Sequence, residues 1–80
     1  MNIDADTVRT LIGKLEFVSN PDRLIDDIPL SHQGVDSLDF VNLLFRFEED
    51  YDIKLPDAEL EGVRSINDIV ALVNRKLGEK

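Results

Sequence analysis

The sequence has no cysteine and no tryptophan, and it contains only three prolines and four glycines among 80 residues. Without cysteine there is no disulfide framework and no thiolate metal site, so stability has to come from helix packing. The remaining composition, 42% hydrophobic and 32% charged, is typical of a folded globular chain and not of a disordered segment. We therefore expect one domain with a thin core, spanning residues 1–80.

Long apolar runs are missing as well. No segment approaches the ~20 apolar residues of a membrane-spanning helix, and the start of the chain, MNIDADTVRT, lacks the basic and apolar regions of a signal peptide. Basic residues are also few, since 9 lysines and arginines face 17 acids and give a net charge of −8. This charge would repel nucleic acid and anionic membranes. The sequence thus predicts a monomeric cytoplasmic protein that binds neither.

The periodicity of apolar residues predicts a first helix near residues 5–17, after Asp4 or Asp6, either of which is a suitable N-cap. Two prolines and a glycine then interrupt any regular element between residues 18 and 35. This stretch is expected to be a long connection held by a few apolar anchors, Leu24, Ile25, Ile28 and Leu30. Connections of this length inside compact domains are often functional.

The second half of the chain predicts three further helical segments. One runs from Asp36, its N-cap, to about Tyr51, a short turn follows near residues 58–62, and Ser65 opens a last helix that Gly78 ends. The predicted fold class is all-α. It is a small four-helix bundle with three main helices, one short helix and a long first connection.

The helix predicted after Asp36 carries two apolar stripes. One stripe is expected to face the core, and it consists of Phe40, Leu43, Leu44, Phe47 and Tyr51. The other stripe consists of Leu38, Val41 and Phe45, and it is bordered by Asn42, Glu48 and Glu49. This pattern has two interpretations. In the first, the helix is central, and neighbours on two sides bury both stripes. In the second, the stripe of Leu38, Val41 and Phe45 is an exposed apolar strip with an acidic rim, as on a partner-binding surface.

Ser37 follows the predicted N-cap, where free backbone N–H groups and the positive end of the helix dipole favour an attached phosphate. As a nucleophile it lacks a Gly-x-Ser-x-Gly turn, and the single histidine, His32, lies upstream with no evident oxyanion arrangement. One histidine without cysteine also argues against a metal site. We therefore expect Ser37 to be modified rather than to attack a substrate.

The segment GVDSLDFVNLLFRFEEDYDIKLPD resembles the signature region of acyl carrier proteins, and the resemblance is strong over about residues 34–56. In that family a Gly-x-Asp-Ser-Leu motif presents the serine that receives 4′-phosphopantetheine. The resemblance therefore implies that Ser37 bears this covalent arm. It implies a carrier and not an enzyme, because the arm's thiol would hold acyl or aminoacyl thioesters while separate enzymes act on them.

The resemblance also implies roles for neighbouring residues. Asp36 resembles the acid that helps to dock the phosphopantetheinyl transferase and its magnesium. The surface contacted by this transferase and by acyl-loading and acyl-processing enzymes would include Leu38, Asp39, Val41, Asn42, Phe45, Glu48 and Glu49. Residues that could shelter an acyl chain are Leu55, Leu60 and Val63, for which ordinary core packing is the simpler explanation.

Some residues depart from the pattern of fatty-acid carriers. Those proteins resemble Asp-Leu-Gly-Ala-Asp-Ser-Leu around the serine, whereas this chain has His32-Gln33-Gly34-Val35 before Asp36. They also place an acid where Asn42 stands and a small residue where Arg46 stands. The departures favour a free-standing carrier of a specialised acyl pathway over housekeeping fatty-acid synthesis.

Two alternatives to a carrier remain open. One is an unmodified helical adaptor that keeps the carrier fold and binds a partner through the strip formed by Leu38, Val41 and Phe45. The other is a small serine hydrolase.

Overall fold

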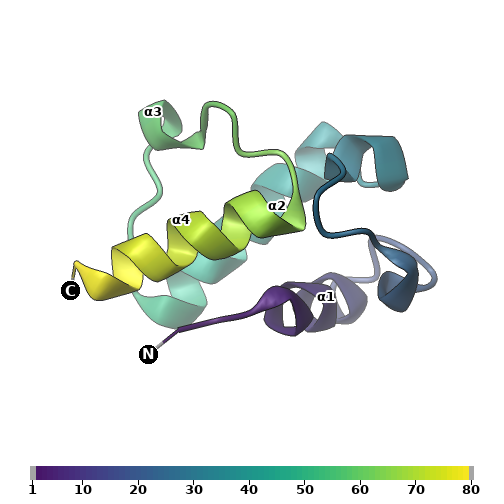
Figure 1. The fold of residues 1–80 in the computed structure, drawn as a ribbon, viewed down its shortest axis with the longest axis horizontal. Helices are drawn as coiled ribbons and strands as arrows, with labels where there is room; N and C mark the ends of the chain where they lie inside the picture. The colour runs from purple at the N-terminus through teal and green to yellow at the C-terminus, as the bar shows by residue number, and fades with distance from the viewer. Residues whose placement is uncertain (1, 80) are drawn as a thin grey trace.

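The computed structural model describes residues 2–79, which contain helices and no strand. The elements follow one another in the order α1 (Ala5–Lys14), η1 (Pro21–Arg23), η2 (Leu30–Gln33), α2 (Ser37–Tyr51), α3 (Asp57–Leu60) and α4 (Ile66–Gly78), where η marks a short 3₁₀ helix (Figure 1). Three main helices and one short helix confirm the predicted all-α class. None of the helices in residues 2–79 is long and apolar enough to cross a membrane.

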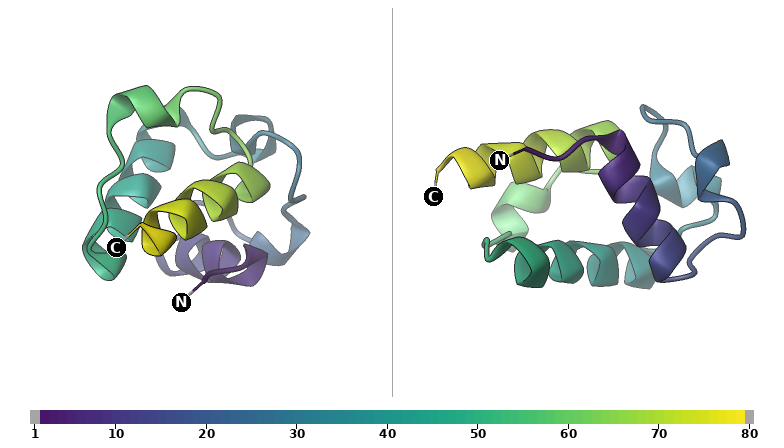
Figure 2. Two further views of the ribbon diagram at one scale, coloured as in Figure 1. Left: turned by 60° about the vertical axis from the view of Figure 1, so that its left-hand side comes forward. Right: turned by 90° about the horizontal axis from the view of Figure 1, so that it is seen from below.

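The core lies between α1, α2 and α4. Figure 2 shows that α2 and α4 run in the same general direction, from the end holding the long connection toward the end holding the C-terminus. The short helix α3 lies on the crossover between them (Figure 1). Each main helix buries an apolar face in this core: Val8, Leu11 and Ile12 of α1, Leu43, Leu44 and Phe47 of α2, and Ile66, Ile69, Leu72 and Val73 of α4. Phe40 and Tyr51, predicted core residues, are half-buried and pack against it.

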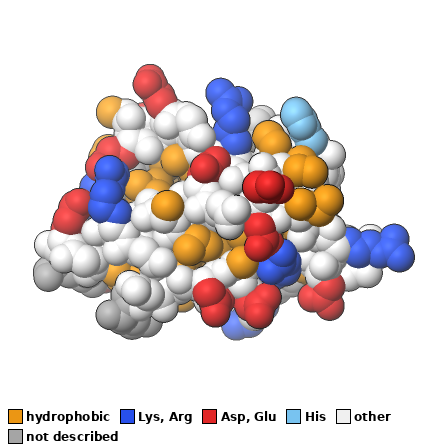
Figure 3. Space-filling view, in the orientation of Figure 1, with side chains coloured by type: hydrophobic (Ala, Val, Ile, Leu, Met, Phe, Trp, Pro, Cys, Tyr) orange, Lys and Arg blue, Asp and Glu red, His pale blue; other side chains and the backbone are white. Residues whose placement is uncertain are grey.

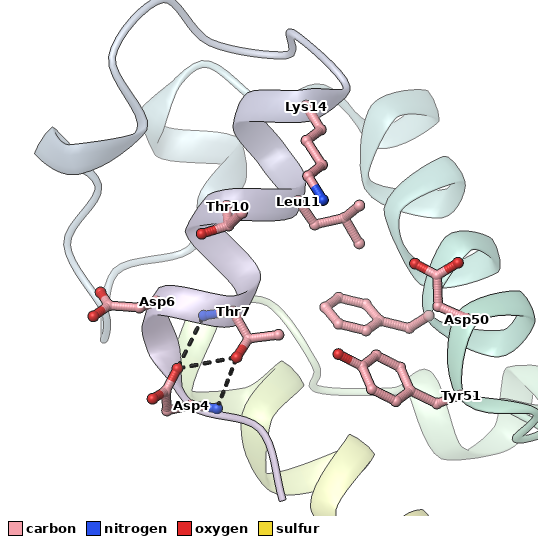
Figure 4. A pocket seen from close by; sticks show the side chains of 9 residues that line it. Asp4, Asp6, Thr7, Thr10, Leu11, Lys14, Asp50 and Tyr51 are labelled. Atoms are coloured by element: carbon pink, nitrogen blue, oxygen red, sulfur yellow. Dashed lines mark hydrogen bonds between the residues drawn. The ribbon is translucent and has the colours of Figure 1, made fainter.

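Helix α1 begins with a capping box. The Asp4 carboxylate accepts a hydrogen bond from the Thr7 backbone N–H at 3.0 Å, and the Thr7 hydroxyl accepts one from the Asp4 N–H at 3.3 Å (Figure 4). Of the two predicted N-caps, Asp4 is therefore the one used. Just before it, the Asn74 side chain of α4 exchanges two hydrogen bonds with the backbone of Ile3. This pair joins the start of the chain to the last helix.

Helix α1 is three residues shorter than the predicted range 5–17. Glu16 adopts the left-handed conformation with φ 60°, its N–H donates to the carbonyl of Gly13, and the N–H of Phe17 donates to the carbonyl of Ile12. These two bonds form a Schellman motif, which satisfies the last carbonyls of the helix. The left-handed position of such a motif is usually glycine. Because glutamate stands there, the sequence carried no signal for the stop.

The connection between α1 and α2 is held by the side chain of Gln33. Its Oε1 accepts from the Ile25 N–H at 2.7 Å, and its Nε2 donates to the carbonyls of Ile25 at 3.0 Å and Ile28 at 2.9 Å. Leu24 and Leu30 are buried, as predicted for anchors of this connection. Ile25 was wrongly predicted to be an anchor. Ile25 is 51% exposed, and its hydrogen bonds to Gln33 involve its backbone and not its side chain.

Backbone hydrogen bonds attach the same connection to the start of α4. The N–H of Leu30 donates to the carbonyl of Arg64 at 2.8 Å, and the N–H of Asn67 donates to the carbonyl of Asp26 at 3.0 Å. The Asp26 carboxylate also forms an ion pair with Arg9 of α1. The connection between α1 and α2, predicted to be irregular, is therefore held in place by contacts with both α1 and α4.

Helix α4 begins where the sequence predicted. The Ser65 hydroxyl accepts from the Asp68 N–H at 3.2 Å, and the Asp68 carboxylate accepts from the N–H groups of Ser65 at 3.1 Å and Arg64 at 3.0 Å. The hydrogen bond from the Arg64 N–H is the main cause that lowers the pKa of Asp68 below its usual value. Through these hydrogen bonds the Asp68 carboxylate fixes the turn that enters α4.

Candidate functional site at the start of helix α2

The chain turns sharply just before Ser37. Gly34 ends η2 with φ 94°, and the N–H groups of Gly34 and Val35 both donate to the carbonyl of Leu30. A residue with a Cβ would be strained at this φ, which explains why glycine stands there. Val35 is buried, with 1% of its surface exposed. The buried valine and the turn together fix the point from which α2 starts.

Asp36 is the N-cap of α2, as predicted. Its carboxylate accepts from the Asp39 N–H at 2.8 Å. In the described residues Asp39 makes no return hydrogen bond to the backbone of Asp36, so this helix start has a single side-chain cap and no capping box. Asp39 is half-buried, whereas Asp36 is exposed.

Ser37 is the first residue of α2, and its side chain is exposed. Within residues 2–79 neither its hydroxyl nor the side chain of His32 is hydrogen-bonded to another group of the protein. The nucleophile and base pair of a serine hydrolase is therefore not assembled. The hydroxyl stands at the helix end where backbone N–H groups and the helix dipole favour a phosphate.

A shallow hollow of about 250 Å³ lies directly beside Ser37. Its walls come from η2, the start of α2 and the segment before α4, and they consist of Ser31, Val35, Asp36, Ser37, Phe40, Val41, Val63 and Arg64. Of the three residues predicted to shelter an acyl chain, only Val63 lines this hollow. Leu55 is buried in the core and Leu60 packs against it.

The second apolar stripe of α2 is exposed. Leu38 is 68% exposed, Val41 41% and Phe45 55%, so the interpretation of α2 as a helix with both stripes buried is wrong. We call these three residues the apolar strip. Figure 3 shows one face of the molecule, on which acidic and basic side chains lie around separate apolar areas and the histidine lies at the edge. The apolar strip begins one residue after Ser37.

One of the two acids predicted for the rim of the apolar strip also bonds within the fold. Glu49 and Asn42 are exposed, but the carboxylate of Glu48 accepts from the backbone N–H of Leu55 at 2.9 Å and is half-buried. Glu48 thus holds the chain that leaves α2. Arg46 is exposed and forms an ion pair of 3.1 Å with Asp50 one turn later.

A larger hollow of about 380 Å³ lies elsewhere, between α1 and the last turns of α2 (Figure 4). Lys14 and Asp50 face each other across it, and Phe47 forms part of its wall. No residue predicted for the site lines it. The hollow beside Ser37 is therefore the one that concerns the predicted chemistry.

Sequence reasoning missed four side chains of the smaller hollow, Ser31, Val35, Phe40 and Arg64. Phe40 was assigned wholly to the core, yet it is half-buried and also forms a wall of the hollow. Arg64 was not singled out, although among residues 2–79 it is the one basic residue that lines the hollow. A lone arginine before a helix cap carries no signal, because its proximity to Ser37 depends on how the long connection folds.

Comparison with known proteins identifies the family. Residues 6–73 match the family model described as a phosphopantetheine attachment site. The chain belongs to the acyl carrier protein family. It is 41% identical over 61 residues to an acyl carrier protein of Thermotoga maritima, which covers 76% of this chain and 69% of the relative. An acyl carrier protein of Phenylobacterium zucineum is 38% identical over 63 residues, 79% of this chain and 73% of the relative.

A third relative is an acyl carrier protein of Akkermansia muciniphila, 47% identical over 45 residues, which is 56% of each chain. Membership of the acyl carrier protein family implies a covalently attached 4′-phosphopantetheine, and it implies interactions with a phosphopantetheinyl transferase and with acyl-processing enzymes in general. The start of α2 fits this group. It offers an exposed hydroxyl, an adjoining hollow with apolar walls and one basic side chain.

Proposed function

We propose that Ser37 is the residue of this acyl carrier that bears 4′-phosphopantetheine. The observation that supports the assignment is the exposed Ser37 hydroxyl at the first position of α2, beside a hollow whose walls are largely apolar. Asp36, in capping α2, holds the backbone that presents this hydroxyl. The arm supplies the thiol on which acyl groups travel, and the protein supplies its anchor and its recognition surface.

Attachment requires coenzyme A and a phosphopantetheinyl transferase. The Ser37 oxygen attacks the phosphorus next to the pantetheine, and a new P–O bond forms. The bond from this phosphorus to the rest of coenzyme A breaks, so adenosine 3′,5′-bisphosphate leaves. The hydroxyl proton passes to a base of the transferase. Asp36 is exposed next to Ser37, where it can help to bind the transferase and its magnesium.

The assignment predicts a single modification. Incubation with coenzyme A and a broad-specificity transferase should add the mass of one phosphopantetheine group to the chain, as measured by intact-mass spectrometry. Ser37→Ala should abolish the addition. Ser31→Ala is the matched control, since Ser31 is also an exposed serine that lines the hollow, and this variant should still be modified. An unchanged mass with several transferases would contradict the assignment and favour the unmodified adaptor.

The apolar strip is proposed to be the surface that the transferase and acyl-processing enzymes contact. Exposed apolar side chains next to the modified residue support this proposal, since an enzyme acting at Ser37 has to approach the start of α2. Glu49 and Asn42 supply polar groups at the rim, and Asp39 lies one residue beyond Leu38. Charges at such a rim mainly affect association rates.

Phe45→Ala should lower the kcat/KM of the transferase about tenfold, which corresponds to about 1.4 kcal/mol and is typical of an aromatic contact residue. Ile25→Ala is the matched control, because the Ile25 side chain is 51% exposed and that of Phe45 is 55% exposed. Neither change should lower the melting temperature much. Equal kinetic effects of the two substitutions would count against the apolar strip as the contact surface.

We further propose that the cargo belongs to a specialised acyl pathway. Exposed Asn42 and the exposed Arg46–Asp50 ion pair make the rim less acidic and bulkier than that of a fatty-acid carrier, and Glu48 is engaged with Leu55. Enzymes with strongly basic docking surfaces would associate more slowly with such a rim than with a strongly acidic one. If the fatty-acid malonyl transferase and ketosynthase of the same cell loaded and extended this carrier as well as their own, the pathway proposal would be wrong.

A further inference from the structure

The hollow beside Ser37 contains one positive side chain in an otherwise acidic region. Arg64 lines it together with Asp36 and Ser37, and Asp39 lies in the first turn of the same helix. The whole chain carries a net charge of −8. A phosphodiester on Ser37 would add a further negative charge next to Asp36. Arg64 is the basic side chain positioned to offset it.

The backbone of Arg64 is fixed on both sides. Its carbonyl accepts from the Leu30 N–H at 2.8 Å, and its N–H donates to the Asp68 carboxylate at 3.0 Å. The first contact ties Arg64 to η2, whose end leads into Ser37, and the second ties it to the cap of α4. The Cα of Arg64 therefore has a defined position relative to the start of α2.

The guanidinium of Arg64 is not used by the fold. Among residues 2–79 the basic side chains that form ion pairs within 4 Å are those of Arg9, Arg46, Arg75 and Lys76. Arg64 is exposed and has only a longer-range attraction to Asp68, whose carboxylate already accepts bonds from two backbone N–H groups. An arginine with a fixed backbone and an unused side chain is suited to bind an anion.

We infer that the guanidinium of Arg64 pairs with the phosphodiester that Ser37 bears, and that this contact holds the first part of the arm against the apolar walls of the hollow. The inference rests on the proposed attachment at Ser37. The planar fork of arginine matches two phosphate oxygens, which gives both orientation and a stronger hydrogen bond than a neutral donor gives. The walls beneath would contact the carbon chain that follows the phosphate, and they are formed by Val35, Phe40, Val41 and Val63.

The backbone N–H groups at the start of α2 favour a phosphate less strongly than those of an uncapped helix would. The Asp36 carboxylate already accepts from the Asp39 N–H and places a negative charge at the same helix end. The positive partial charge of the helix is thereby partly neutralised before any phosphate is attached. Arg64 acts from a different segment, outside α2, and acts as a positioning residue that orients the arm.

The test is ³¹P NMR of the carrier after attachment of 4′-phosphopantetheine, comparing the native sequence with Arg64→Gln and Arg23→Gln. Arg23 is the matched control, because it is also exposed, forms no ion pair within the described residues, and lines a different hollow. The ³¹P signal should shift and sharpen in Arg64→Gln, because the phosphate loses its partner and gains mobility, and it should stay unchanged in Arg23→Gln.

Salt and the arginine signal provide a second readout. In roughly 1 M salt, where the Debye length is about 3 Å, the ³¹P signal of the native carrier should move toward that of Arg64→Gln. The Arg64 Nε–H signal should also differ between the modified carrier and Ser37→Ala. Arg64→Lys, which keeps the charge without the fork, should give an intermediate ³¹P signal, and this variant serves if Arg64→Gln folds poorly.

The possible outcomes separate the inference from the function on which it rests. If the arm attaches to Ser37 but the ³¹P signals of the native carrier, Arg64→Gln and Arg23→Gln coincide, Arg64 does not bind the phosphate and only the inference is overturned. If intact-mass spectrometry shows no arm on Ser37, the assignment of Ser37 is wrong and the inference falls with it.

Discussion

The hydrogen bond from the Leu30 N–H to the Arg64 carbonyl, 2.8 Å long, is the contact on which the arrangement of the site depends. It joins η2, which precedes Ser37, to the segment that enters α4. The bond from the Asn67 N–H to the Asp26 carbonyl reinforces it. Ordering a connection of this length costs conformational entropy. These bonds, with Gln33 and the buried side chains of the connection, offset that cost and fix the start of α2.

The same contact creates the hollow beside Ser37. One wall comes from η2 and α2 and the opposite wall from Val63 and Arg64, so the hollow exists only while the two segments stay joined. The acyl carrier therefore uses its long connection as part of the site and not merely as a link between helices. The apolar strip, in contrast, depends only on the periodicity of α2, which leaves Leu38, Val41 and Phe45 outside the core.

The elements that could be predicted are those whose signals are local. The cap at Asp36, the capping box at Ser65 and the apolar faces of the helices follow from residue type and spacing, whereas spacing located the apolar strip and left open whether it is exposed. What could not be predicted depends on contacts between distant segments or on unusual residues at special positions. Glu16 ends α1 where glycine is usual, and Glu48 bonds to the backbone of Leu55.

The link between the long connection and α4 also explains why Arg64 could not be recognised from its position in the sequence. Nothing in the residues around Arg64 indicates that its carbonyl binds Leu30. Only the structure shows that Val63 and Arg64 lie opposite Ser37, because the hydrogen bond between Leu30 and Arg64 brings together two segments that are far apart in the sequence.

Native-state hydrogen exchange of the Leu30 amide tests this account most directly. Leu30 is fully buried and its N–H is bonded across two segments, so its amide should be protected to the same degree as amides inside α4, such as that of Val73. The Asn67 amide should be protected as well. Exchange of the Leu30 amide at the rate of an exposed residue of the connection, such as Ser19, would show that the connection between α1 and α2 is not fixed against α4. This result would contradict the account.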